Sequence, residues 1–478
     1  METKLKFLLP IFFLFVAFLQ IKGQTNISGN ISINTVWTTK GSPYIIIDTV
    51  IVTGGVILTL KPGIIVRFRN GAELRINYSS IVAIGTPLNP ITFTSDSPIP
   101  HAGIWSTISI NGGDDTLSTF NYCNFEYAAA AIRNNGGVLS LLKVKNCNFN
   151  SNVIGINDIG WRAMAIDSCN FKNNTEYGLF ELESSTISNC NISNNKIGIS
   201  AMNIGGYNVH IDNCMIDLNQ IGIEGLYPNS TIKNSIIRSN QYGIIFKPSN
   251  GYISLAKGNL IDSNKIAGIV LKGGFTIDSC QIRYNGIGII DSGGINQNII
   301  IRNKMEYNSS GIILGTSKDI FRCNKICNNT LYDLKSITLN DIKIPDNFWC
   351  SSDSLSILEK ISDGNDTSSL GIVKITPLDT VQCCDSSNVL VINKTDGKII
   401  GNSILIFPNP VSDYLTLALK PNISEAEIKV FNIIGGLEYS TLTNRDETII
   451  DVTYFKSGLH IIQIIRGNSI IIRKFIKK

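Results

Sequence analysis

The 478-residue chain has few of the residues on which most catalytic and nucleic-acid-binding sites depend. Only 16% of its residues are charged and its formal net charge is +4, which argues against the basic surface of a nucleic-acid-binding protein. Three histidines, His101, His210 and His460, leave few candidates for a histidine-based catalytic triad. There is no phosphate-binding loop, no dinucleotide-binding glycine motif and no Cys-x-x-Cys pair. We therefore expect no cofactor, no metal site and no nucleic-acid partner.

Long hydrophobic runs are also scarce, and the one that stands out lies at the N-terminus. An apolar stretch from Phe7 to Leu19 follows Lys4 and Lys6 and is succeeded by small or polar residues near Gly23. This pattern predicts a secretory signal peptide over residues 1–23, because the run is too short to span a bilayer. We expect an exported protein without a transmembrane segment.

What the chain does have is a short phrase that occurs eight times between residues 147 and 313. In each phrase an asparagine is followed three or four residues later by a glycine and then by an apolar residue. The glycines recur with a mean spacing of about 22 residues, which is typical of solenoid proteins. The asparagines are Asn152, Asn174, Asn195, Asn219, Asn240, Asn264, Asn285 and Asn308, and the glycines are Gly155, Gly178, Gly198, Gly222, Gly243, Gly268, Gly288 and Gly311.

Apolar residues stand at fixed distances from each repeated asparagine and alternate with polar neighbours. This two-residue period indicates strands, and the absence of a 3.6-residue period argues against a leucine-rich repeat with helices. Three short strands in every turn of about 22 residues predict an all-β right-handed parallel β-helix. We expect each asparagine to take a left-handed corner and to bond to its neighbours in a ladder, and each glycine to relieve the next bend.

Two further columns of the repeat have alternative interpretations. Cysteines recur five residues before the asparagine, and we expect small buried side chains there, with disulfides between adjacent coils as the alternative. A second column, two residues before the asparagine, alternates in charge and predicts either an ion-pair ladder or a groove that grips an acidic polymer. The cysteines are Cys147, Cys169, Cys190, Cys214 and Cys280, and the charged residues are Asp217, Arg238, Asp262, Arg283 and Glu306.

The candidate catalytic residues are His210, Asp212, Asp217 and Arg238, which fall on one predicted coil and the next. Two carboxylates that flank a sugar can act as acid and base, and an arginine can neutralise a uronate carboxylate. The alternative is that all four are ordinary surface residues of a stacked sheet.

The candidate ligand-binding residues lie in segments of variable length between the repeats. Aromatic rings beside Arg and Lys suit stacking on sugars, whereas the alternative is that each ring covers a coil edge. They are Trp161, Arg162, Tyr207, Tyr227, Lys247 and Tyr252.

Residues 44–385 resemble the right-handed β-helix repeat family associated with carbohydrate-binding and sugar-hydrolysing proteins. The phrases LKPG, NGAEL and GTPLNPITFTS are similar to the opening coils of its secreted members, and Asn347-Phe348-Trp349-Cys350 to a closing segment, where we expect Trp349 to plug the last coil. The NTD, GHG and RIK motifs of polygalacturonase-type hydrolases are absent, as is the Asp-His pair of pectate lyases. The last cysteines, Cys323 to Cys384, are candidates for disulfides in an exported protein.

The C-terminal region resembles the type A sorting domain of the type IX secretion system. The matching residues are Phe407-Pro408-Asn409-Pro410, Asp413, Val430-Phe431-Asn432, Gly435, Ser457-Gly458 and the basic end Arg473 to Lys478, with Leu459-His460 where the family has an aromatic residue. The resemblance implies a small β-sandwich that addresses the protein to this secretion machinery.

The expected organisation is a signal peptide (1–23), capping strands and degenerate coils (24–110), β-helix repeats (111–345), a closing segment (346–385), a linker (386–402) and a sorting domain (403–478). We expect a secreted or cell-surface binding, adhesion or structural module associated with glycans. The alternative is a polysaccharide lyase or glycoside hydrolase with an unusual active site.

Overall fold

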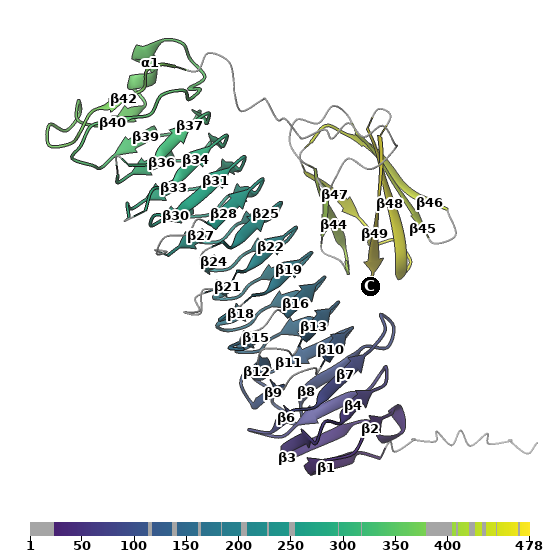
Figure 1. Cartoon of the computed structure of the whole chain (residues 1–478). Coiled ribbons are helices and arrows are strands. Elements are labelled where there is room, and N and C mark those ends of the chain that lie inside the picture. The colour runs from purple at the N-terminus through teal and green to yellow at the C-terminus, as the bar shows by residue number, and fades with distance from the viewer. Residues whose placement is uncertain are drawn as a thin grey trace, which may run out of the picture.

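The computed structural model is an elongated stack of parallel coils followed by two small antiparallel sheets (Figure 1). It describes residues 23–112, 117–135, 141–160, 164–182, 184–201, 208–226, 229–247, 254–294, 296–316, 318–378, 404–407, 410–419, 426–432, 436–445, 447–466 and 469–478. The predicted signal peptide and linker therefore lie almost wholly outside the described residues. No helix in the described part of the chain is long and apolar enough to cross a membrane.

The first face of the coils is a sheet of thirteen parallel strands. Its strands are β2 (Thr35–Trp37), β4 (Ile57–Leu60), β7 (Ser80–Ile84), β10 (Leu117–Asn121), β13 (Leu141–Lys145), β16 (Met164–Asp167), β19 (Thr186–Ser188), β22 (His210–Asp212), β25 (Thr231–Lys233), β28 (Ser254–Lys257), β31 (Phe275–Asp278), β34 (Ile299–Ile301) and β37 (Ile320–Arg322).

The second and third faces form one 27-stranded sheet, because β3 (Tyr44–Thr53) pairs with both β5 and β6, and β1 (Thr25–Ile31) pairs with β3. The second face contains β5 (Ile65–Phe68), β8 (Ile91–Ser95), β11 (Cys123–Glu126), β14 (Asn148–Asn150), β17 (Asn170–Lys172), β20 (Asn191–Ser193), β23 (Met215–Asp217), β26 (Ile236–Arg238), β29 (Leu260–Asp262), β32 (Gln281–Arg283), β35 (Lys304–Glu306) and β38 (Lys325–Cys327). The third contains β6 (Glu73–Asn77), β9 (Trp105–Asn111), β12 (Ala128–Asn134), β15 (Ile154–Asp158), β18 (Tyr177–Phe180), β21 (Ile197–Ala201), β24 (Ile221–Gly225), β27 (Tyr242–Phe246), β30 (Ala267–Leu271), β33 (Ile287–Asp291), β36 (Ser310–Leu314), β39 (Tyr332–Ser336) and β41 (Ile361–Ser362).

The apolar columns predicted from the repeat form one continuous core inside the coils. Stacked strands place equivalent residues above one another, so that Phe93, Phe125, Phe149 and Phe171 form a column of parallel rings with centroids 4.6–4.9 Å apart. Each of these rings is fully buried. The prediction of an all-β parallel solenoid with about 22 residues per coil is confirmed.

The repeated asparagines form the predicted ladder, but at a different position in the corner. Each side-chain Nδ2 from Asn152 to Asn308 donates to Oδ1 of the next asparagine, at 2.9–3.1 Å. The left-handed backbone falls one residue earlier, as at Asn173 and Asn194 with φ of 57°. The expectation that the ladder asparagine itself takes this conformation was wrong, because its side chain must point into the coil to bond to its neighbours.

The repeated glycines are required for a different reason from the one we expected. A Cβ atom on Gly243 would lie 2.4 Å from the carbonyl oxygen of Gly268, and one on Gly288 would lie 2.4 Å from that of Gly311. Neither glycine has a positive φ. The glycine therefore permits close stacking of successive coils rather than relief of a bend.

The ends of the solenoid are closed by short elements. A one-turn 3₁₀ helix, η1 (Thr39–Gly41), lies in the first coil, and the last coil is followed by β40 (Ile342–Lys343), α1 (Ser354–Leu358) and β42 (Val373–Lys374). Trp349 is buried in the same core as the coils.

The C-terminal region has a core of its own, separate from that of the coils. One antiparallel sheet contains β43 (Ile404–Phe407), β44 (Tyr414–Leu419) and β47 (Glu447–Asp451), and the other contains β46 (Leu437–Thr443), β45 (Ala426–Asn432), β48 (Gly458–Arg466) and β49 (Ser469–Lys477).

Candidate functional site

The charged column predicted from the sequence lies on the second face of the solenoid. Strand pairing stacks Asp217 on Arg238, Arg238 on Asp262, and Asp262 on Arg283. Arg283 Nε lies 3.0 Å from Asp262 Oδ2, as the ion-pair ladder predicts, and Arg238 Nη1 lies 2.7 Å from Glu447 Oε1 of the C-terminal region. The two carboxylates and two guanidinium groups thus alternate along four successive coils.

An apolar stripe runs beside this column on the same strands. Met215 and Ile236 are buried, and the partly buried Leu260 packs against them. The stripe and the charged column together line a cavity of about 290 Å³. The residues around it are Asp217, Leu218, Ile236, Arg238, Ser239, Leu260, Asp262, Ser263, Arg283 and Glu447.

Asp217 is a buried carboxyl in the wall of this cavity. It is only 8% exposed, and among the described residues its Oδ1 has no hydrogen-bond partner. Burial raises the pKa of its carboxyl above the ordinary value, and the opposing charges of Arg238 and Lys172 reduce that effect. Asp217 therefore keeps a proton to higher pH than an exposed aspartate does.

The other two candidate catalytic residues lie on the first face. His210 and Asp212 belong to β22, whereas Asp217 belongs to β23. The ring Nδ1 of His210 lies 3.0 Å from the hydroxyl of Thr231, and Oδ1 of Asp212 accepts a hydrogen bond of 2.9 Å from Asn234 Nδ2. The fold thus brings Asp217 and Arg238 together and places His210 and Asp212 in a different sheet.

Most of the candidate ligand-binding residues cannot be placed. Trp161, Arg162, Tyr207, Tyr227 and Tyr252 lie outside the described residues.

The remaining candidate ligand-binding residue, Lys247, is exposed directly after β27 on the third face. Its Nζ lies 3.9 Å from Oε2 of Glu224. Glu224 is 8% exposed and accepts a hydrogen bond from the hydroxyl of Ser200 at 3.3 Å.

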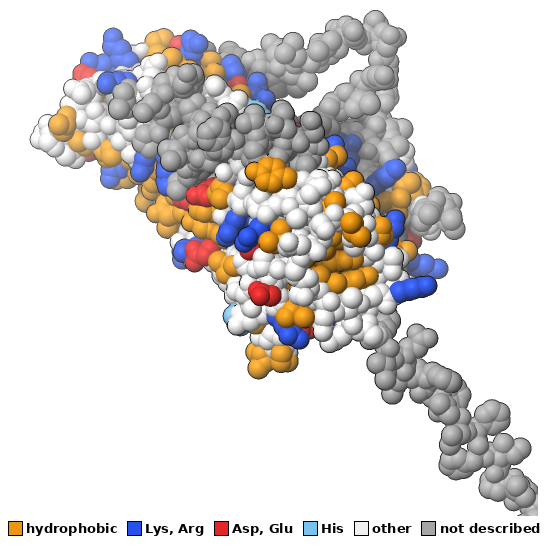
Figure 2. All heavy atoms as spheres, turned by 60° about the horizontal axis from the view of Figure 1, so that its bottom comes forward, with side chains coloured by type: hydrophobic (Ala, Val, Ile, Leu, Met, Phe, Trp, Pro, Cys, Tyr) orange, Lys and Arg blue, Asp and Glu red, His pale blue; other side chains and the backbone are white. Residues whose placement is uncertain are grey.

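The surface carries both basic and acidic side chains. In the view of Figure 2, basic and acidic side chains are scattered among polar and apolar ones, without a large region of one sign. Ion pairs between coils also stabilise the first face, where Lys145 pairs with Asp167 at 3.0 Å and Lys257 with Asp278 at 3.4 Å. Opposite charges on stacked strands stabilise the register of neighbouring coils.

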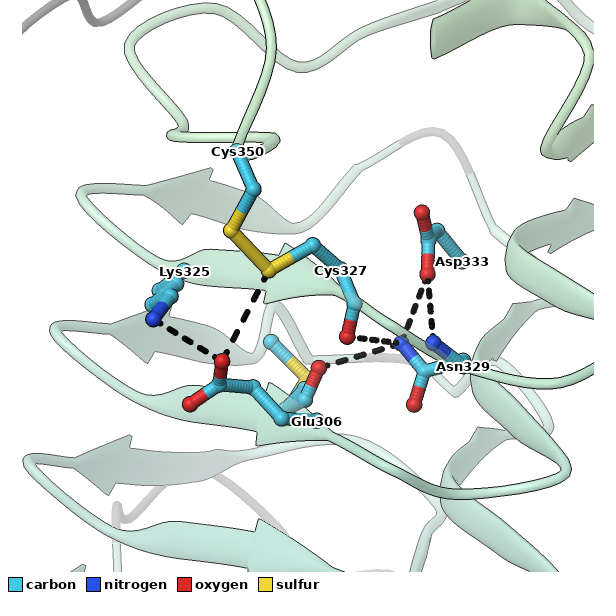
Figure 3. The surroundings of a disulfide bond; sticks show 7 residues. Glu306, Lys325, Cys327, Asn329, Asp333 and Cys350 are labelled. Atoms are coloured by element: carbon cyan, nitrogen blue, oxygen red, sulfur yellow. Dashed lines mark hydrogen bonds and ion pairs between the residues drawn. A yellow bond between two sulfur atoms is a disulfide. The ribbon is translucent and has the colours of Figure 1, made fainter.

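The cysteines of the coils and those that follow the repeats have different surroundings, and Cys383 and Cys384 lie outside the described residues. Cys123, Cys147, Cys169, Cys190, Cys214 and Cys280 are free and buried in the coils, and burial raises the pKa of the thiols from Cys147 onwards. Cys327 forms a disulfide with Cys350 across 23 residues of sequence (Figure 3). The expectation of small buried side chains in the repeat column is confirmed, because all five cysteines of that column are free and buried. The disulfide joins two residues that lie outside this column.

One group of potential metal ligands occurs in the described part of the chain, and it surrounds this disulfide. Glu306 Oε1 lies 3.7 Å from Cys327 Sγ and 2.9 Å from Lys325 Nζ (Figure 3). Both sulfurs are bonded to each other, so neither offers a thiolate, and Lys325 already neutralises the carboxylate. These donors do not suit a metal ion.

Sequence reasoning missed two tyrosines next to the cavity. Tyr284 and Tyr307 are half exposed and their rings stack with centroids 5.4 Å apart. The signal was present in the repeat, since a tyrosine directly precedes the asparagine only in these two phrases.

Comparisons with known proteins agree with the fold. The family described as right handed beta helix region matches residues 128–277, and the secretion system C-terminal sorting domain matches residues 405–478. The family of the periplasmic copper-binding protein NosD matches residues 206–365, but the donors described above do not fit copper. The chain therefore carries a right-handed β-helix region followed by a sorting domain, and it is secreted or displayed on the cell surface.

Individual relatives are distant. An ulvan lyase of Nonlabens ulvanivorans is 38% identical over 63 residues, which are 13% of this chain and 12% of that protein. The chain thus matches only about an eighth of the length of this curated relative. The crystal structure of an alginate lyase from Paenibacillus sp. strain FPU-7 has 12% sequence identity and a TM-score of 0.18, with 68% of this chain and 92% of that chain covered. At this TM-score the likeness supports no inference about the site.

Proposed function

We propose that this secreted β-helix protein binds an acidic polysaccharide along the second face, at the cavity between β23 and β32. The observation that carries the proposal is Asp217, a buried carboxyl with a raised pKa that stands beside the guanidinium of Arg238 at the cavity wall. A protonated carboxyl donates a hydrogen bond to a sugar carboxylate or hydroxyl, and it adds no negative charge that would repel the polymer.

The rest of the cavity suits the same class of ligand. Guanidinium groups bind carboxylates with two parallel hydrogen bonds, and Arg238 and Arg283 both line the cavity. The apolar stripe of Ile236 and Leu260 offers a surface for the C–H groups of a sugar ring. A chain of sugars along the solenoid axis would therefore meet charged and apolar groups side by side in successive coils.

Cleavage of the polymer by elimination is the second candidate function. The predicted pair Asp212 and Asp217 does not flank one glycosidic bond, because the two residues belong to strands of different sheets. Elimination needs the uronate carboxylate to be neutralised, so that a base can remove the proton beside it while the leaving oxygen departs and a double bond forms. Asp217 and Arg238 would supply that neutralisation, and the short match to an ulvan lyase supports the same class of reaction.

The test uses the full chain with alginate, ulvan and the neutral glucan laminarin. Co-elution on size-exclusion chromatography measures binding, and ultraviolet absorbance of a new double bond measures elimination. Because the carboxyl of Glu447 contacts Arg238, the assay is repeated with Glu447→Gln, which removes a competing anion. Arg238→Gln is expected to weaken retention of the acidic polymers. Asp341→Asn, which directly precedes β40 and is paired with Lys374, serves as the control.

The pH dependence of polymer binding tests the role of Asp217 directly. Asp217 becomes negatively charged as the pH rises through its raised pKa, so affinity for an acidic polymer is expected to fall over that range. Asp217→Asn imitates the protonated form, and its affinity is expected to stay constant over the same range. Equal retention of laminarin and alginate, or an unchanged pH dependence in Asp217→Asn, would contradict the proposal.

A further inference from the structure

The second corner of the coils, between the second and third faces, has one position with a left-handed backbone in every repeat. This position directly precedes the ladder asparagine, and its φ values lie between 54° and 59°. Asparagine and serine tolerate this conformation better than larger residues do. The residues are Ser151, Asn173, Asn194, Leu218, Ser239, Ser263, Tyr284, Tyr307 and Asn328.

Three residues depart from the pattern of small residues at this corner, namely Leu218, Tyr284 and Tyr307, and only the two tyrosines are aromatic. Their φ values are 55° and 59°, and their side chains remain 55% and 50% exposed. A bulky side chain in left-handed backbone lowers stability, and residues held in this way often serve binding. Little burial offsets the cost here, because about half of each side chain faces solvent.

The two rings form a pair on consecutive coils. Their centroids are 5.4 Å apart and their planes differ by 13°. The guanidinium carbon of Arg283 lies 5.6 Å from the centroid of the Tyr284 ring. The pair therefore presents two parallel aromatic rings with a cation beside them.

This corner is also one wall of the cavity described above. Leu218, Ser239 and Ser263 line the cavity, and Tyr284 is the next residue of the same corner row. Arg283 connects the two, because it lines the cavity and contacts the Tyr284 ring. A polymer that leaves the cavity along the solenoid axis would next meet the tyrosine pair.

We propose that Tyr284 and Tyr307 form an aromatic subsite that contacts sugar rings in an acidic polysaccharide, with Arg283 directed to a sugar carboxylate. The inference rests on the proposed binding function and extends it by one coil, because Arg283 already lines the cavity. The exposed parts of the two stacked rings offer C–H edges and hydroxyl groups to a pyranose ring, and a neighbouring arginine suits a uronate.

The test exploits the backbone conformation. Asparagine fits left-handed backbone better than tyrosine, so the double variant Tyr284→Asn/Tyr307→Asn is expected to fold with unchanged or higher stability. Its affinity for alginate is expected to fall at least about tenfold, because both aromatic contacts with the polymer are lost. The matched control is Tyr78→Asn, which has a φ of 47° and is 69% exposed but follows β6 in an early coil.

Binding is measured by titration of the full chain with alginate, with thermal unfolding in parallel. Reduced affinity in the double variant alone, at unchanged stability, supports the subsite. Normal affinity in the double variant, with binding still lost in Arg238→Gln, overturns the subsite and leaves the proposed function in place. A wild-type chain that binds no acidic polymer overturns both. A shift from dimer to monomer in the double variant, without change in affinity, would show that the rings contact a second copy of the chain instead.

Discussion

Replacement of Asn264 by alanine tests whether the buried asparagine ladder holds the coils together. Asn264 is fully buried, and its side chain makes four hydrogen bonds of 2.9–3.1 Å. Its Oδ1 accepts from the backbone and side-chain nitrogens of Asn240, and its Nδ2 donates to the carbonyl of Ile237 and to Oδ1 of Asn285. The substitution removes all four bonds. Asn240 Nδ2 keeps its bond to the carbonyl of Ile216, and Asn285 Oδ1 keeps its bond from the backbone nitrogen of residue 264, so the backbone nitrogen of Asn240 and the carbonyl of Ile237 lose most.

The expected loss is large because each buried polar group that loses its partner costs about 1–3 kcal/mol. Local relaxation will recover some bonds, so we expect a net destabilisation of roughly 3–6 kcal/mol. The matched control is Asn148→Ala on the second face, where two side-chain bonds of 2.8 Å are partly open to water. There we expect about 1 kcal/mol or less, since water can replace the lost partner.

Urea unfolding of both variants, followed by circular dichroism, gives the comparison, and hydrogen exchange reports which coils open. Solenoid repeats contact only their neighbours, so the exchange increase in Asn264→Ala should concentrate in the coils of Asn240 and Asn285. If Asn264→Ala cost no more than Asn148→Ala, the ladder would be incidental to stability and the reasoning would be refuted.

Two further predictions concern stability. Gly243→Ala should destabilise the chain by several kcal/mol, because the new Cβ would lie 2.4 Å from the carbonyl oxygen of Gly268; an unfolding midpoint equal to that of the wild type would contradict this. Burial and the neighbouring Asp319 raise the pKa of Asp291 to about 7, so the folded state holds a proton that the unfolded state loses at lower pH. Its contribution to stability is greatest in acid and is lost as the pH rises to above 7, and Asp291→Asn should flatten this part of the stability profile measured between pH 4 and 8.

The fold could be predicted because every coil needs the same types of residue at the same positions. The columns at Phe149 and its equivalents must be apolar, and the asparagine at Asn152 and its equivalents must bond to the next coil. What the pattern could not show was which residue adopts left-handed backbone and why Gly243 is small, because both depend on the distance between neighbouring coils.

The candidate site was predictable only in part. Stacking of Asp217 on Arg238 follows from the repeat, since equivalent residues of successive coils lie side by side. The raised pKa of Asp217 could not be inferred, because it depends on how deeply the carboxyl is buried in the folded chain. The separation of His210 from Asp217 results from a corner between two strands, which sequence distance alone does not show.

The three corners of the coil differ in how much their length varies. From β13 and β14 to β34 and β35, two residues always connect the first face to the second. On the way from the third face to the next coil, five residues separate β24 from β25 and eight separate β21 from β22. Insertions at the third corner leave the asparagine ladder and the apolar columns in register. Insertions and deletions in the gene are therefore tolerated at this corner without a change in the coils. Loops of different length and sequence can evolve there on an unchanged solenoid.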